Sequence, residues 1–124
     1  MACALVVDDE ESVRHMLRRL LEGADFRVFE ASNGKEALRV LDERMVDLII
    51  IDIIMPEMDG IETIMEVRRR SPDLPIIAIS GGSQAAKIDY LESARKLGAN
   101  YTLRKPFSVA EILSIIDEIG AKSG

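Results

Sequence analysis

Short apolar runs alternate along the chain with segments in which apolar residues recur every three or four positions. Three runs are continuously apolar and mostly β-branched, which is typical of strands buried on both faces of a sheet: Ala4–Val7, Leu48–Ile51 and Ile76–Ile79. Two more mixed runs, Arg27–Ala31 and Tyr101–Arg104, suit strands nearer the edges. The pattern therefore predicts five short strands.

The segments between the strands have the spacing of amphipathic helices. Asn33 with Glu36, and Ser108 with Glu111, have the residue types and spacing of helix N-terminal caps, and Gly23 is expected to end the first helix. The predicted helices cover Glu11–Glu22, Lys35–Met45, Asp59–Arg70, Gln84–Leu97 and a last segment that begins at Ser108.

The strand–helix order predicts a parallel sheet that is covered by helices on both faces, with right-handed crossovers. Five such units in 124 residues favour a flavodoxin-like, doubly wound α/β fold with strand order 2-1-3-4-5. We find no repeat and no linker, so we expect residues 1–124 to form one domain, without an output domain.

Composition narrows the classes of function. Lys and Arg number 16 against 22 Asp and Glu, a net charge of −6, which disfavours binding to a nucleic-acid backbone. The single cysteine, Cys3, excludes an internal disulfide and a Cys-rich zinc site. The apolar runs are too short for a membrane span, and the first residues lack the basic segment of a secretory signal. We therefore expect a soluble, cytoplasmic domain that binds neither nucleic acid nor membrane.

Two features of the helices are expected to be structural. Arg68–Arg70 close the third predicted helix, where the helix dipole favours cations, and we expect them to be solvated. His15, the only histidine, lies on the polar side of the first helix and is expected at the surface.

Chemistry is expected where the strands end, because ligands of such sheets bind outside the carboxyl ends of the strands. Asp8 and Asp9 follow the first strand, Asp52 the third, Ser80 the fourth and Lys105 the fifth. Converging carboxylates repel one another unless a cation is present, and carboxylate oxygens suit Mg²⁺. An ammonium and a hydroxyl can contact phosphate oxygens. This set predicts reversible phosphorylation of one carboxylate.

With these residues in place, the chain resembles the receiver domain of two-component response regulators over almost its whole length. The matching segments occur in order and at strand ends: Val6–Glu10, Asp52–Gly60, Ile79–Gly81, Gly98–Ala99 and Lys105–Phe107.

The resemblance implies a role for each acidic residue. Asp52 would be the phospho-acceptor. Asp9, Asp52 and the backbone carbonyl of Ile54 would ligate Mg²⁺ directly, and Asp8 would act mostly through a bound water. The apolar Ile54 side chain would lie at the mouth of the site, where it cannot orient a hydrolytic water, so we expect slow autodephosphorylation.

The resemblance also assigns the groups that would contact the phosphoryl group. Ser80 would be the switch hydroxyl, Lys105 would pair with the phosphate, and the peptide bond between Lys105 and Pro106 would be cis. A histidine kinase or phosphotransfer protein would be the donor. A downstream protein, or a second copy in a phosphorylation-dependent homodimer, would use the face formed by the fourth helix, fifth strand and fifth helix. Core packing alone explains the apolar stripe of that last helix equally well.

The chain departs from the family pattern near this face. Thr102 stands three residues before the motif lysine, where many receivers carry an aromatic residue. Tyr101 is expected on the opposite face of the strand, so coupling between Ser80 and an aromatic rotamer is in doubt. Gly81 and Gly82 open a longer segment, and residues 81–92 are expected to carry most of the phosphorylation-dependent motion.

The leading hypothesis is therefore a signalling phospho-acceptor rather than an enzyme, either stand-alone or excised from a longer regulator. One alternative is a Mg²⁺-dependent phosphohydrolase with an aspartyl-phosphate intermediate, although Asp52 is followed by two isoleucines rather than by Asp-x-Asp. Another is a nucleotide- or flavin-binding flavodoxin-like module, although the chain lacks Gly-x-Gly-x-x-Gly and tryptophan.

Overall fold

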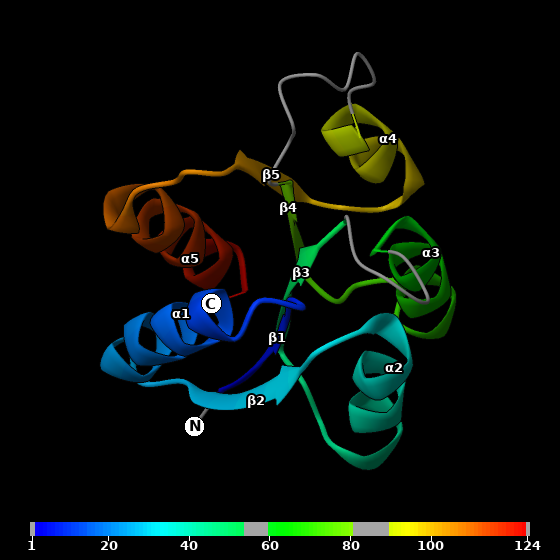
Figure 1. The fold of residues 1–124 in the computed structure, drawn as a ribbon, viewed down its shortest axis with the longest axis horizontal. Coiled ribbons are helices and arrows are strands. Elements are labelled where there is room, and N and C mark those ends of the chain that lie inside the picture. Colours follow the sequence, from blue (N-terminus) through cyan, green and yellow to red (C-terminus); the bar gives the residue numbers. More distant parts are fainter. Residues whose placement is uncertain (1, 54–59, 81–89, 124) are drawn as a thin grey trace.

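The computed structural model describes residues 2–53, 60–80 and 90–123, and its centre is a parallel five-stranded sheet (Figure 1). The strand order is β2-β1-β3-β4-β5, as the sequence predicts for a flavodoxin-like α/β fold. The strands are β1 (Cys3–Val7), β2 (Arg27–Ala31), β3 (Leu48–Asp52), β4 (Ile76–Ser80) and β5 (Tyr101–Arg104).

Helices cover both faces of the sheet, with α1 and α5 on one side and α2, α3 and α4 on the other (Figure 1). Each side has its own apolar core, so the central strands are buried on both faces. In the part of the chain that the structure describes, every helix lacks the length and apolar character needed to cross a bilayer. The helices are α1 (Glu11–Gly23), α2 (Gly34–Glu43), α3 (Gly60–Arg70), α4 (Tyr90–Leu97) and α5 (Val109–Ser123).

Two predicted helix ends are wrong by one or two residues. Gly23 is the last residue of α1 rather than the residue after it, and Asp25 takes the left-handed turn with φ 68°. A short polar side chain tolerates that conformation. The second helix ends at Glu43 instead of Met45, because Arg44 is already extended and leads the chain toward β3. The predicted starts of the third and fourth helices lie outside the described residues.

The predicted N-terminal caps are confirmed. Asn33 Oδ1 accepts a hydrogen bond of 2.9 Å from the Glu36 N–H, and Ser108 Oγ accepts one of 3.1 Å from the Glu111 N–H. The Glu111 carboxylate in turn accepts from the Ser108 N–H, whereas Glu36 accepts from the backbone N–H and hydroxyl of Ser32. These bonds order the loops that follow β2 and β5, at the edge of the sheet where the site is expected.

The expectation that all three arginines at the end of α3 are solvated is wrong for Arg68. Its guanidinium donates to the carbonyls of Gly98 and Pro72, both at 2.7 Å, and to Asn100 Oδ1 at 3.0 Å. Partial burial lowers the pKa of Arg68. The local pattern could not show this, because Gly98 lies 30 residues away along the chain. Arg69, in contrast, is exposed as predicted.

Candidate functional site

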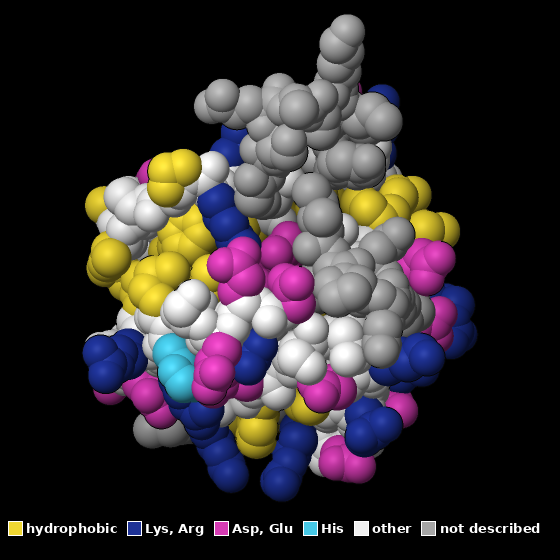
Figure 2. All heavy atoms as spheres, viewed as in Figure 1, with side chains coloured by type: hydrophobic (Ala, Val, Ile, Leu, Met, Phe, Trp, Pro, Cys, Tyr) yellow, Lys and Arg dark blue, Asp and Glu magenta, His cyan; other side chains and the backbone are white. Residues whose placement is uncertain are grey.

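Acidic side chains gather where the central strands end. Figure 2 shows several of them near the middle of the face in view, beside a basic side chain. Asp52 is the last residue of β3 and Asp8 follows β1, and these strands are hydrogen-bonded neighbours. Both carboxylates are buried, with exposed fractions of 4% for Asp52 and 1% for Asp8.

The first residue of α3 lies directly against the end of β3, next to Asp52. Gly60, the first residue of α3, donates its N–H to the Ile53 carbonyl at 3.2 Å. A Cβ at Gly60 would lie 2.2 Å from Ile53 Cα and 2.4 Å from the Asp52 carbonyl oxygen. Only glycine therefore allows the helix to begin this close to the end of the strand.

Lys105 joins the two buried carboxylates. Its Nζ donates to Asp8 Oδ2 at 3.0 Å and to Asp52 Oδ2 at 3.1 Å, and it lies 3.6 Å from the Glu10 carboxylate. Burial lowers the pKa of the ammonium, but its bond to Asp8 and the charges of both aspartates outweigh burial, so the pKa of Lys105 is raised. Lys105 is thus a fixed cation between two acidic residues.

Asp8 accepts hydrogen bonds at both carboxylate oxygens. Its Oδ1 accepts the Glu10 N–H at 2.9 Å, while Oδ2 accepts from Lys105. Burial nevertheless raises the pKa of Asp8, because these two donors only partly replace water around the carboxylate. The site therefore holds a buried negative charge that a further cation would stabilise.

The residues fit a hard divalent cation. One carboxylate oxygen each from Asp8, Asp9 and Glu10 lie within 4.8 Å of one another, with Asp8 buried and the other two exposed. All-oxygen donor sets that leave room for water are the ligands Mg²⁺ prefers. Asp52 is outside this group and is connected to it through Lys105. The contact of Glu10 with Lys105 was missed at the sequence level, although Glu10 stands in the same acidic run.

Two of the predicted switch residues, Ser80 and Pro106, adjoin Lys105. Ser80 ends β4, is 3% exposed, and its carbonyl accepts the Lys105 N–H at 2.9 Å. The peptide bond between Lys105 and Pro106 is cis, the conformation that the resemblance implies. Ile54, Gly81 and Gly82, which were assigned to the metal site and the switch segment, lie outside the described residues.

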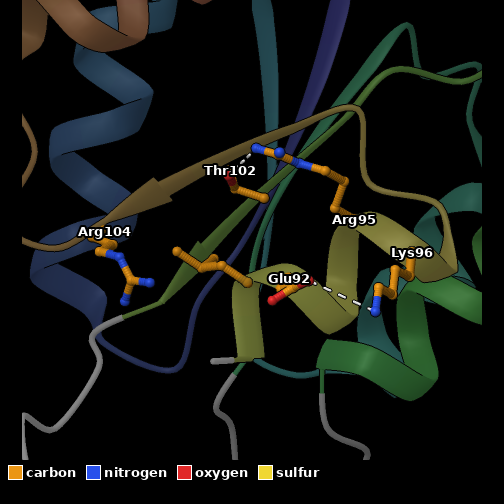
Figure 3. Close-up of a pocket in the computed structure, with 6 residues that line it drawn as sticks. Glu92, Arg95, Lys96, Thr102 and Arg104 are labelled. Atoms are coloured by element: carbon orange, nitrogen blue, oxygen red, sulfur yellow. Dashed lines mark hydrogen bonds and ion pairs between the residues drawn. The ribbon is translucent and has the colours of Figure 1, made fainter. Parts of the chain in front are cut away.

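Thr102 and Tyr101 face opposite sides of β5, as the alternation of strand side chains predicts. Tyr101 packs against the core beneath α1 and α5. Thr102 faces α4, where its hydroxyl accepts a hydrogen bond of 3.1 Å from Arg95 (Figure 3). Around Thr102 is a hollow of about 450 Å³ lined by Leu91, Glu92, Arg95, Lys96, Thr102 and Arg104. A polar, charged hollow thus borders the position where many receivers carry an aromatic side chain.

Comparison with known proteins identifies the family. The family model described as response regulator receiver domain matches residues 4–117, so the chain belongs to this family. The chemotaxis protein CheY of Listeria monocytogenes is 35% identical over 92% of this chain and 94% of that protein. Other curated relatives are much longer, and the chain spans only 12% of one sensor kinase.

Solved structures agree with this assignment. The beryllofluoride-activated NtrC4 receiver domain dimer is 35% identical, with a TM-score of 0.88 over 100% of both chains. The response regulator TrrA of Thermotoga maritima, solved in complex with Mg²⁺ and BeF, is 30% identical, with a TM-score of 0.84 over 96% of this chain and 98% of that one. Family and fold place this chain in two-component phosphorelay signalling.

Proposed function

We propose that this domain accepts a phosphoryl group on Asp52, in a Mg²⁺-dependent reaction, from a histidine kinase or phosphotransfer protein. An Asp52 carboxylate oxygen forms a bond to phosphorus as the bond between phosphorus and the donor nitrogen breaks, and that nitrogen keeps the electron pair. The observation that carries the proposal is the Lys105 ammonium, which is bonded to both Asp52 and Asp8.

Each residue has a defined task in this proposal. Lys105 already contacts the Asp52 oxygen and is in position to pair with a phosphoryl oxygen added there. Asp8, Asp9 and Asp52, with the Ile54 carbonyl, would hold the metal, and Glu10 lies at the edge of their group. Bound Mg²⁺ would neutralise charge on the phosphoryl oxygens and the carboxylates. The Ser80 hydroxyl would donate to the phosphoryl group.

We propose that the chain acts as a signalling acceptor, whose only catalysis is its own phosphorylation and dephosphorylation. The signal would reach a downstream protein through the face formed by α4, β5 and α5. On that face, α4 and β5 border the charged hollow at Thr102. The NtrC4 receiver dimer supports a phosphorylation-dependent homodimer as one form of this contact.

The phosphoryl donor would approach Lys105 from the side of α1, rather than from the face formed by α4, β5 and α5. Lys105, Pro106 and Phe107 line an apolar hollow of about 420 Å³ together with Val13 and Met16 of α1. Because this hollow reaches Lys105, an apolar helix face of the donor seated there would bring its phosphohistidine to the site. We expect Met16→Glu to slow transfer from phosphorylated histidine domains but not from acetyl phosphate.

Intact mass after incubation with acetyl phosphate and Mg²⁺ tests the proposed reaction. We expect one phosphoryl group on the wild-type chain, and none without Mg²⁺ or in Asp52→Asn. Titration with beryllofluoride and Mg²⁺, followed by amide chemical shifts, covers the case in which the small-molecule donor is not accepted. No adduct and no shift at Asp8, Asp52 or Lys105 would contradict the proposal.

A further inference from the structure

Arg14, a residue of α1, makes two contacts outside its helix that the proposed chemistry does not use. Its Nη1 donates to the backbone carbonyl of Asp8 at 2.7 Å, and its Nε donates to Glu30 Oε1 at 3.2 Å. The side chain is largely buried, with 16% exposed, and so is that of Glu30 with 18%. One guanidinium therefore links α1, the end of β2 and the loop that carries Asp8 and Asp9.

The position of this cation is electrostatically unfavourable by itself. Arg14 lies near the N-terminus of α1, where the helix dipole repels positive charge. Its side chain also donates a hydrogen bond to the loop that is proposed to bind Mg²⁺. A positive charge that close disfavours the binding of a second cation. A cation that opposes both the helix dipole and the binding of Mg²⁺ is expected to have a compensating structural role.

The other contacts of the loop act on Asp8 and Glu10 at its two ends: Asp8 Oδ1 accepts the Glu10 N–H, and Lys105 contacts both carboxylates. Glu10, the N-cap residue of α1, makes no side-chain capping bond, and its carboxylate lies toward Lys105 instead. The Asp8 N–H donates to the Ala31 carbonyl at 3.1 Å, which anchors only the start of the loop. The Asp8 carbonyl belongs to the planar peptide unit that begins Asp9, so a bond to that oxygen orients Asp9.

We propose that Arg14 is a positioning residue for the metal site: by holding the Asp8 carbonyl it presents the exposed Asp9 carboxylate beside the buried Asp8. Glu30 holds the guanidinium in place and balances its charge. The inference rests on the proposed function for its consequence, which is tighter Mg²⁺ binding. Its structural part concerns the metal-free protein and can be measured separately.

The first experiment uses ¹⁵N relaxation of metal-free protein. In Arg14→Met the Asp9 amide order parameter should fall from the rigid range, about 0.85, toward 0.6 or below. Arg18 provides the matched control, because it also pairs with Glu30 but contacts the Val28 carbonyl rather than Asp8. An unchanged Asp9 order parameter in Arg14→Met, or an equal fall in Arg18→Met, would overturn the proposal.

The second experiment measures the Mg²⁺ dissociation constant by amide-shift titration. We expect roughly tenfold weaker binding in Arg14→Met, a size typical of lost outer-shell contacts, and an intermediate value in Arg14→Lys. A purely electrostatic role predicts the opposite sign, because removing a cation would tighten Mg²⁺ binding. Unchanged or tighter binding in Arg14→Met overturns the positioning role, whereas a wild-type chain without Mg²⁺ affinity contradicts the proposed function and leaves the relaxation result to decide on Arg14.

Discussion

Single residues decide the geometry of the site through contacts that tolerate little change. Asp52 is held at the end of β3 because Gly60 allows α3 to begin against the Asp52 carbonyl. Lys105 is held because two buried carboxylates accept from it. The residue types follow from the chemistry, whereas their tolerance to substitution depends on the atoms around them.

Glycine substitution tests this dependence on surroundings. Gly60→Ala should destabilise the fold by about 3 kcal/mol, because the new Cβ would overlap backbone that cannot move without displacing Asp52. Gly120→Ala is the matched control: nothing lies within 4 Å of a Cβ there, and alanine in an exposed helix should stabilise by about 0.5–1 kcal/mol. Urea unfolding of both variants measures the difference, and equal effects would show that space at Gly60 is not limiting.

At the scale of elements, hydrogen bonds between a helix end and a loop help to position α2 and α3. Glu36 ties the start of α2 to Ser32 after β2, and Arg68 ties the end of α3 to the turn between α4 and β5. These bonds use charged partners, so each is stronger than a neutral hydrogen bond. They are the contacts in which single substitutions should have effects beyond their own helix.

The Glu36 contact predicts a pH-dependent stability. Hydrogen bonds from the Ser32 backbone and hydroxyl lower the pKa of Glu36 below its ordinary 4.5 in the folded state. The lowered pKa means that the ionised form stabilises the fold above pH 4.5, and that this contribution is lost as the pH falls through the folded-state pKa. The stability difference between wild type and Glu36→Gln should therefore shrink from pH 6 to pH 3.

Urea unfolding across that range measures this difference. Ser32→Ala serves as the comparison, because it removes the hydroxyl donor but keeps the backbone N–H. Its pH dependence should lie between those of the wild type and Glu36→Gln. A difference that is constant with pH would show that the Glu36 carboxylate does not contribute through its charge.

The Arg68 contact predicts unequal effects of two adjacent arginines. Arg68→Met should lower the free energy of unfolding by about 2 kcal/mol, because it leaves the carbonyls of Gly98 and Pro72 without their charged donor. Arg69→Met removes only an exposed pairing with Glu66 and should change it by less than about 0.5 kcal/mol. Thermal unfolding compares them, and equal effects would contradict a structural role for Arg68.

At the scale of the whole molecule, net negative charge and a concentrated acidic site act together. The chain has a net charge of −6, and carboxylates of three residues contact or approach a single ammonium at the site. A cation that binds only the folded protein should therefore increase global stability.

Mg²⁺ should raise the free energy of unfolding by about 2.7 kcal/mol at a hundred times its dissociation constant. The Asp9→Asn variant should lose most of this gain, because it removes one exposed carboxylate of the group without disturbing the buried Asp8. Sodium chloride at equal ionic strength controls for general screening. If sodium chloride stabilises as much as Mg²⁺, the acidic group is not a specific site.

The sequence by itself determined the order of strands and helices and the fold class, and it indicated which residues could form the site. Continuous β-branched runs indicate strands buried on both faces, and the strand–helix alternation allows few topologies, so the fold follows from local pattern. Asp52 stands out in the sequence because an acidic residue at the end of a continuously apolar strand has few structural reasons to be there, whereas Asp8 and Lys105 gain meaning only together with it. Helix ends were less certain, since Asp25 and Arg44 take backbone conformations that depend on the following strand.

Only the tertiary structure decided which groups meet. The contacts of Lys105 with Asp8 span 97 residues and those of Arg68 with Gly98 span 30, and no periodicity encodes such distances. The same holds for Arg14. A cation in the first turns of α1 is unusual in the sequence, but the sequence does not show that its partner is the Asp8 carbonyl. The alternation of apolar and polar residues within an element reflects which of its faces is buried. Hydrogen bonds between elements depend instead on how the folded sheet places those elements next to one another.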